Sequence, residues 1–185
     1  IRRPPRSTLF PYATLFRSLR TTSEGLRVCQ EPAVELRKLR GTLQHWQDRA
    51  ITVAESPASL GLTGSLWELE AELAPDSAED VGFRFALDSG RELKIGYDRL
   101  RQQVFCDQQG EPRAAAAQPM RGETLELHLL IDHAVIEIFA EGGETAFVAL
   151  IDPDASVTDI ATFAKGGSAR ALSLNAWPLG DRGAN

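Results

Sequence analysis

Carboxylate and histidine side chains gather in one stretch of the sequence, residues 131–153, on both sides of a Gly-Gly pair. Asp132 and Glu137 precede the pair. Asp152 follows it, and Asp154 comes just after the stretch, separated from Asp152 by a proline. Glycoside hydrolysis needs two carboxyl groups about 5–10 Å apart, one of them an acid. This stretch could therefore form an active-site hairpin. It could also be scaffold, because Asp-Pro-Asp is typical of an ordinary turn, which is the interpretation that we favour.

The remaining acids and histidines alternate with apolar residues. Glu68, Glu70 and Glu72 do so in the segment "SLWELEAEL", which predicts a half-buried strand with a solvated acidic face. His128 lies between two leucines and is expected on an outer face in the same way. The other two histidines, at positions 45 and 133, have no sequence neighbours that mark a triad or a metal site.

The sequence contains no motif of a nucleophile-elbow hydrolase, a dinucleotide-binding enzyme, a P-loop protein or a zinc peptidase. Its two cysteines, Cys29 and Cys106, are far apart and have no zinc-ligand spacing, which favours two small buried apolar residues. These patterns therefore give no support to those enzyme classes or to a zinc site.

The composition is that of one globular domain. The chain has 185 residues, of which 43% are hydrophobic and 25% charged. No apolar run reaches the length of about 18 residues that crosses a bilayer, so no membrane partner is expected. The formal net charge of -6 argues against nucleic acid as a partner.

Short alternating segments follow one another, separated by turn signals about every 8–12 residues, as in antiparallel sandwiches and barrels. Two inward rows are expected, made by Leu125, Leu127, Leu129 and Ile131 and by Phe83, Phe85 and Leu87. Gly142 and Gly143 can supply the positive φ angles of a hairpin turn. Only residues 31–39 have helical spacing. The predicted fold is all-β: a two-sheet antiparallel β-sandwich, concanavalin-like, with a short helical turn in the lead-in.

Residues 1–18 differ from the rest, because they contain four arginines, three prolines and no acid. A transit peptide is one interpretation, but the prolines would break its amphipathic helix. A basic arm that binds nucleic acid is another, which the acidic body disfavours. The stretch most closely resembles an in-frame translation of a sequencing adapter, and the chain opens on Ile1 rather than Met. We expect a truncated gene whose residues 1–18 are an artefact without ordered structure.

The three tryptophans are candidates for stacking on sugar rings, as in carbohydrate-binding sandwiches. Trp67 continues an apolar row and is expected in the core. Trp46 and Trp177 are the candidate sugar-contacting residues.

From residue 19 to 179, the order of segments resembles the C-terminal β-sandwich module of glycoside hydrolase family 32, which includes invertases, levanases, inulinases and sucrose-6-phosphate hydrolases. Its most specific piece is an Asp-x-x-x-Ile/Val-Glu-x-Phe hairpin, made here by Asp132, Ile136, Glu137 and Phe139. The closing Leu-x-x-Trp-x-Leu agrees, at Leu174, Trp177 and Leu179. The family commonly has Arg after the Asp of the hairpin, whereas this chain has His133, which puts a local ion pair in doubt.

The resemblance implies a two-domain, cofactor-free retaining β-fructosidase, in which a five-bladed β-propeller carries the catalytic carboxylates. Residues 19–43 would then be the lead-in from the propeller, 44–180 the sandwich and 181–185 a tail. The family's catalytic motifs, Trp-x-Asn-Asp-Pro-Asn-Gly, Arg-Asp-Pro and Glu-Cys, do not occur in this sequence. We therefore predict no catalytic residue in this chain, and likewise no cofactor-binding residue and no metal site. The parent is expected to cleave sucrose or a fructan and the fragment alone to be inactive, with the propeller as partner and a homodimer as a further assembly.

Two alternatives stay open: a free-standing carbohydrate-binding sandwich, which would use Trp46 or Trp177, and a lectin-like interaction domain without sugar binding. The sequence does not distinguish sucrose, sucrose 6-phosphate, levan and inulin as substrates. It also leaves the location open between the bacterial cytoplasm and secretion.

Overall fold

The computed structural model describes residues 15–22, 25–52, 58–108, 110–120, 122–151 and 154–180. Within these ranges the chain forms β-strands and one short 3₁₀ helix. This helix is too short to cross a membrane, and the described residues contain no other.

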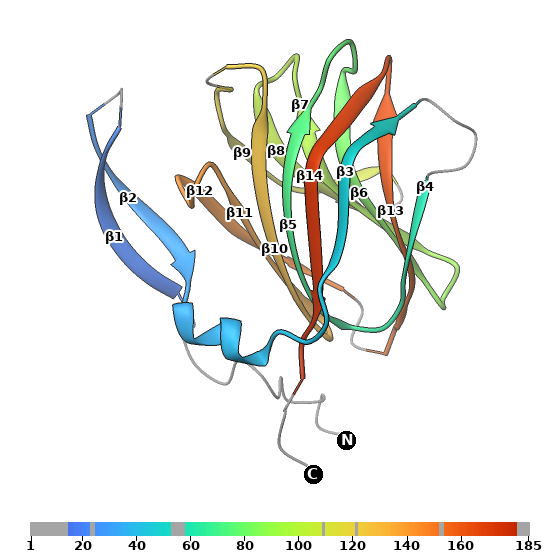
Figure 1. Ribbon diagram of the computed structural model, residues 1–185. Helices are drawn as coiled ribbons and strands as arrows, with labels where there is room; N and C mark the ends of the chain where they lie inside the picture. Colours follow the sequence, from blue (N-terminus) through green and yellow to red (C-terminus); the bar gives the residue numbers. More distant parts are fainter. Residues whose placement is uncertain are drawn as a thin grey trace.

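Two six-stranded antiparallel sheets pack face to face (Figure 1). The first sheet has the order β12–β11–β10–β5–β14–β3 and the second β4–β13–β6–β7–β8–β9. The strands of the first sheet are β3 (Gln44–Ile51), β5 (Leu66–Ala74), β10 (Leu125–Asp132), β11 (Val135–Ala140), β12 (Thr145–Leu150) and β14 (Ala169–Pro178). Those of the second are β4 (Ala58–Leu62), β6 (Asp80–Leu87), β7 (Glu92–Asp98), β8 (Gln103–Gln108), β9 (Glu111–Ala117) and β13 (Val157–Lys165). The predicted all-β sandwich is confirmed.

The core lies between the sheets and is built from the predicted alternation. The row from Leu125 to Ile131 is at most 1% exposed, and the facing row of the second sheet is at most 4% exposed. Burying one such large apolar side chain stabilises the fold by about 1.5–3 kcal/mol. Trp67 is also in this core, as predicted, and its indole N–H donates to the carbonyl of Thr63 at 2.9 Å.

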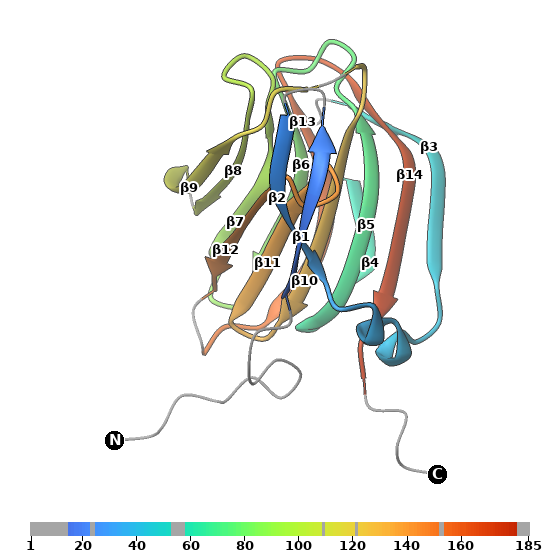
Figure 2. The same cartoon turned by 90° about the vertical axis from the view of Figure 1, so that its left-hand side faces the viewer.

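A separate two-stranded sheet precedes the sandwich. It consists of β1 (Leu15–Thr22) and β2 (Gly25–Pro32), and η1 (Val34–Leu39), the predicted short helical turn, joins it to β3. Figure 2 shows this hairpin standing in front of the first sheet. Residues 1–14 and 181–185 lie outside the described residues. Residues 15–18 belong to β1, so the expected lack of ordered structure is wrong for these four, because they pair with residues 29–32.

The hairpin contacts the sandwich at the turn between β11 and β12. Gly142 and Gly143 have φ angles of 59° and 82°, which confirms the predicted Gly-Gly turn. The Gln30 N–H donates to the carbonyl of Gly143 at 2.9 Å, and the Arg20 guanidinium donates to that of Gly142 at 3.2 Å. A Cβ atom on Gly143 would overlap the carbonyl oxygen of Gln30. The hairpin can therefore approach this turn only because residue 143 has no side chain.

We predict that Gly143→Ala detaches the hairpin from the turn. Gly90→Ala is the matched control, because Gly90 has a similar φ of 77° but a Cβ atom on it would meet no other heavy atom within 4 Å. Both changes should cost about 1–2 kcal/mol for the left-handed backbone. Only Gly143→Ala should also accelerate hydrogen exchange at the Gln30 amide, measured by NMR. Equal exchange at this amide in both variants would contradict the prediction.

Candidate functional site

A cluster of charged and aromatic side chains covers part of the outer face of the first sheet. It consists of Arg40, Glu68, Glu70, His128 and Trp177. The register across β10, β5 and β14 brings four of them together, since Glu70 lies opposite His128 and Glu68 lies opposite Trp177. Side chains alternate between the two faces of a strand, so the glutamates point away from the core that Leu69 and Leu73 enter.

Arg40 comes from the lead-in and closes the cluster. Its Nε atom donates to Glu68 Oε2 at 2.7 Å, and its Nη2 atom donates to Glu68 Oε1 at 2.8 Å and to Glu70. The guanidinium carbon lies 3.7 Å from the centre of the Trp177 ring, a cation–π contact. On the other side, His128 Nε2 lies 2.7 Å from Glu68 Oε1. The Glu68 carboxylate is thus in contact with both the Arg40 guanidinium and the His128 ring.

The predicted solvated acidic face is wrong for Glu68, whose side chain is only 2% exposed. The reason is that Arg40, 28 residues earlier in the chain, lies over it. Burial on its own would raise the pKa of Glu68, but the hydrogen bonds from Arg40 and His128 outweigh burial and lower this pKa to about 2. The same contact raises the pKa of Arg40. Glu68 is therefore ionised at neutral pH.

Glu68 does not fit the general acid of a glycosidase. A general acid must hold a proton near the working pH, which a carboxyl group with a pKa of about 2 does not do. Ligand atoms of Glu68, Glu70 and His128 lie within 4.8 Å of one another, close enough to share a metal ion. The Arg40 guanidinium already bridges both carboxylates, and its charge takes the place that a cation would have.

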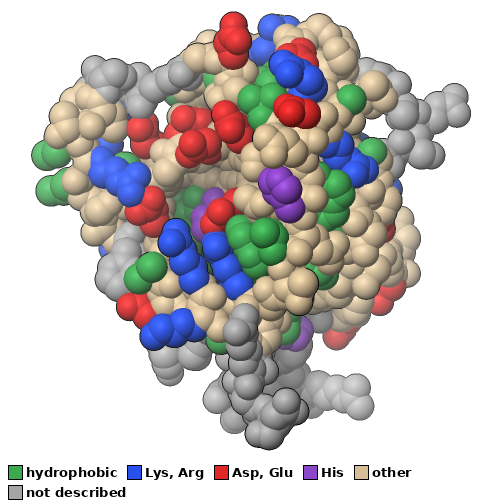
Figure 3. All heavy atoms as spheres, viewed as in Figure 1, with side chains coloured by type: hydrophobic (Ala, Val, Ile, Leu, Met, Phe, Trp, Pro, Cys, Tyr) green, Lys and Arg blue, Asp and Glu red, His purple; other side chains and the backbone are tan. Residues whose placement is uncertain are grey.

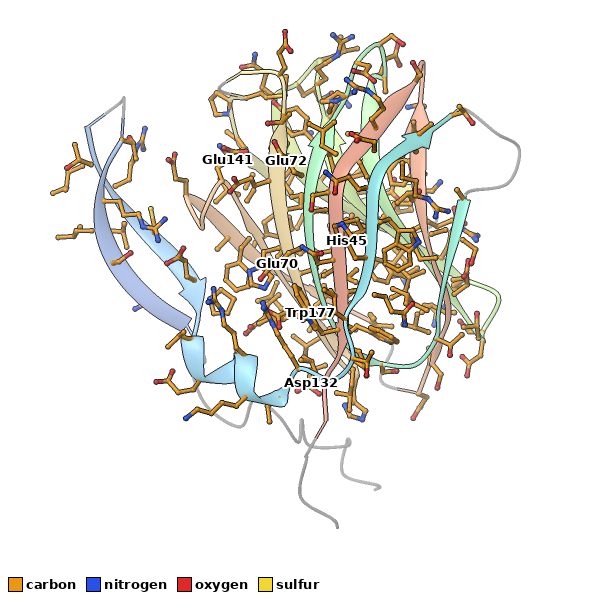
Figure 4. All side chains as sticks on the ribbon, in the orientation of Figure 1. His45, Glu70, Glu72, Asp132, Glu141 and Trp177 are labelled. Atoms are coloured by element: carbon orange, nitrogen blue, oxygen red, sulfur yellow. The ribbon has the colours of Figure 1, made fainter. Side chains whose placement is uncertain are left out.

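A cleft of about 550 Å³ lies next to the cluster, between the outer sheet face and the end of β2 with η1. Glu70, Glu72 and Glu126 line its floor, and Glu31 and Arg37 line its other wall. Figure 3 shows acidic side chains around this hollow, and Figure 4 shows Glu70 and Glu72 on the side that faces the hairpin. The cleft is mainly acidic and polar.

The structure separates the two candidate sugar-contacting tryptophans. Trp46 lies opposite Leu174 and packs, partly buried, against the main core. Trp177 lies on the outer face of the same sheet, where Arg40 covers one side of its ring. Trp46 and Trp177 therefore lie on opposite faces of the first sheet.

The remaining candidates lie apart from one another. His45 is on the outer face, with its Nδ1 atom 2.7 Å from Asn175 Oδ1. His133 occupies the turn after β10, and its Nδ1 atom lies 2.8 Å from Oδ1 of the buried Asp132. A local contact to this Asp is therefore present, although the chain has His where the family commonly has Arg. Asp152 lies outside the described residues, and Asp154 is exposed.

Arg40 is the member of the cluster that sequence reasoning missed. It follows a short helical segment that resembles an ordinary connector, and no motif marks it. Cys29 and Cys106 are both buried, as predicted, and neither forms a disulfide within the described residues.

We predict that Glu68 makes the fold sensitive to acid. Its pKa falls from 4.5 to about 2 on folding, so its contribution is fully present above about pH 5 and is lost as the pH falls towards 2. The ionised Glu68 should contribute about 3 kcal/mol to the free energy of unfolding at pH 7, and about 2 kcal/mol of this contribution should be lost at pH 3.

The measurement is urea unfolding at pH 7 and pH 3. Glu68→Gln should be less stable than the unsubstituted chain at pH 7 and should lose less stability on acidification. Glu72→Gln, two residues further along the strand from Glu70 and outside the hydrogen bonds of Arg40, is the control. Parallel pH profiles for the unsubstituted chain and Glu68→Gln would refute the effect.

Comparison with known proteins places this fold in a family. Residues 35–178 match the family described as glycosyl hydrolases family 32 C terminal. The chain is 29% identical to a levanase of Bacillus subtilis (strain 168) over 175 residues, which cover 87% of the chain and 26% of the levanase. It is 26% identical to a levanase of Bacillus sp. (strain L7), covering 88% of the chain and 19% of that protein.

A solved structure supports the fold. The exo-inulinase of Aspergillus awamori superimposes with a TM-score of 0.73 at 16% identity, over 94% of this chain and 37% of the inulinase. The chain thus spans about a quarter or less of the two levanases. With the match over residues 35–178 and the two-sheet sandwich, the chain belongs to the C-terminal domain family of the family 32 glycosyl hydrolases.

Proposed function

We propose that this chain is the non-catalytic C-terminal module of a β-fructosidase that hydrolyses sucrose or a fructan. The observation that carries the proposal is the family match over residues 35–178. It is supported by the names of similar proteins, which are levanases, a vacuolar acid β-fructofuranosidase and an exo-inulinase. In this proposal the substrate is cleaved by a β-propeller that precedes the sandwich in the same polypeptide.

The charged cluster agrees with a non-catalytic role. Arg40 and His128 hold Glu68 in its ionised form, so this carboxyl group cannot protonate a leaving group at neutral pH. Glu70 shares the same guanidinium. The three catalytic motifs of the family do not occur in the sequence. The catalytic carboxylates are therefore assigned to the preceding region.

The hairpin offers a surface for docking on that region. Leu19 and Val28 lie opposite each other, and Leu26 follows on the same face, with exposed fractions of 57–66%. The other face carries the fully buried Cys29 and turns towards the sandwich. Figure 3 shows hydrophobic side chains standing out at the hairpin side of the molecule. An isolated two-stranded sheet is marginally stable in water, and an exposed apolar face marks an interaction site.

We predict that the purified chain releases no fructose from sucrose, levan or inulin, measured as reducing sugar. The full-length product of the gene, cloned with its upstream region, should release fructose under the same conditions. Turnover by the chain alone that Glu68→Gln abolishes would overturn the non-catalytic assignment.

In the full-length protein, Leu26→Lys with Val28→Lys should lower the thermal midpoint, whereas Leu100→Lys, at a residue that is 71% exposed outside the hairpin, should not.

A carbohydrate-binding function is the second candidate, and the position of Trp177 on the outer face favours it. If the chain binds fructan here, levan or inulin should quench tryptophan fluorescence, and Trp177→Ala should abolish the quenching. Trp46→Phe, a conservative change at the core-packed tryptophan, is the control and should retain it. Absence of any sugar-dependent change in the unsubstituted chain would exclude this function.

A further inference from the structure

The connector between the hairpin and the sandwich is attached to the outer face of the first sheet along its length. Connectors between domains are commonly polar and mobile, and domain motion is the usual result. Here η1 contributes to a second, small apolar cluster outside the main core. This cluster consists of Leu36, Leu130, Phe139 and Leu179.

Backbone contacts continue the attachment beyond η1. Arg40 forms an isolated β-bridge with Leu179, and the Gly41 N–H donates to the carbonyl of Pro178 at 2.8 Å. The Gly180 N–H donates back to the carbonyl of Leu39 at 3.2 Å. The start of the sandwich and its last strand therefore hold each other at one end of the first sheet.

The side chain of Arg40 adds directional contacts at this point. A guanidinium group is planar and can bond one carboxylate through two parallel N–H groups, so it fixes an angle as well as a distance. Arg40 makes this two-point contact with Glu68 on β5, also reaches Glu70, and lies against Trp177 on β14. Glu68 is buried, so an open form of the connector would leave its charge without the main partner.

We propose that Arg40 is a positioning residue: it locks the connector onto the first sheet and thereby holds the β1–β2 hairpin at one orientation relative to the sandwich. This lock also orients the catalytic region, a consequence that rests on the proposed function. In this proposal Arg40 contacts no reacting group. It affects the catalytic region only through the orientation of the β1–β2 hairpin.

The test measures the orientation of the hairpin by pulsed EPR, with spin labels on Leu26→Cys and Ser89→Cys. The first site is exposed on the hairpin and the second lies in the exposed turn between β6 and β7. Both native cysteines are buried, which directs the label to the introduced ones. The unsubstituted chain should give one narrow distance distribution. Arg40→Met should broaden it, and Arg40→Lys, which keeps the charge without the two-point contact, should give an intermediate width.

Arg37→Met is the matched control, because Arg37 is exposed in the last turn of η1. It should leave the distribution narrow. If Arg40→Met fails to fold, the double variant Arg40→Met/Glu68→Gln removes the buried charge as well and should fold with a broad distribution. Hydrogen exchange of the η1 amides should accelerate by about 100-fold relative to the β5 amides when the lock is removed.

A narrow distribution in folded Arg40→Met or in the folded double variant, or a broad one already in the unsubstituted chain, overturns the proposal. The distance measurement does not depend on any enzyme activity. If Arg40→Met broadens the distribution but the full-length product releases no fructose, the proposed function fails and the positioning role stands. In an active full-length product, Arg40→Met should lower activity while Arg37→Met does not.

Discussion

The burial of two facing apolar rows between the sheets is the constraint on which the rest of the structure depends. Each strand must turn alternate side chains inward, so a shift of one residue would move its whole apolar row to the solvent side. Leu127 and Leu129 on β10 and Leu69 on β5 are therefore fixed inward, and Glu68, Glu70 and His128 are fixed outward. The charged cluster forms where it does because the core sets the register of these strands.

The outer face of the first sheet is unusual because it is partly covered. An outer sheet face of a sandwich is normally wet, yet here Phe139 and Leu130 are at most 3% exposed beneath η1. This cover also excludes water from Glu68, which then needs the hydrogen bonds of Arg40 and His128 to stay ionised. The small apolar cluster and the ion cluster thus depend on each other, since both require the connector to lie on the sheet.

Alternation and turn chemistry were enough to predict the sandwich, the inward rows, the hairpin turn at Gly142 and Gly143 and the buried Trp67. These features depend on residues that are near one another in sequence. The burial of Glu68 could not be predicted in this way, because it depends on Arg40 from outside the strand, and a local pattern does not show which segment will cover a face. The strand at residues 15–18 was also missed, because the composition of residues 1–18 differs from that of the sandwich. These four residues form a strand by pairing with β2, which their own sequence pattern does not show.

The contribution of the ion cluster is better described as geometric than as energetic. Removing a carboxylate and a guanidinium from water costs several kcal/mol each, and their attraction often does little more than offset this cost. An apolar contact in the same place could stabilise the sheet equally well. It would not set an angle, because apolar side chains can slide and repack, whereas a two-point hydrogen bond weakens steeply when it is misaligned. Glu68, Glu70 and His128 are residue types that often perform catalysis. Here the guanidinium of Arg40 holds Glu68 charged and also binds Glu70. This arrangement is suited to holding a chain segment in place, and it makes Glu68 unsuited to donating a proton.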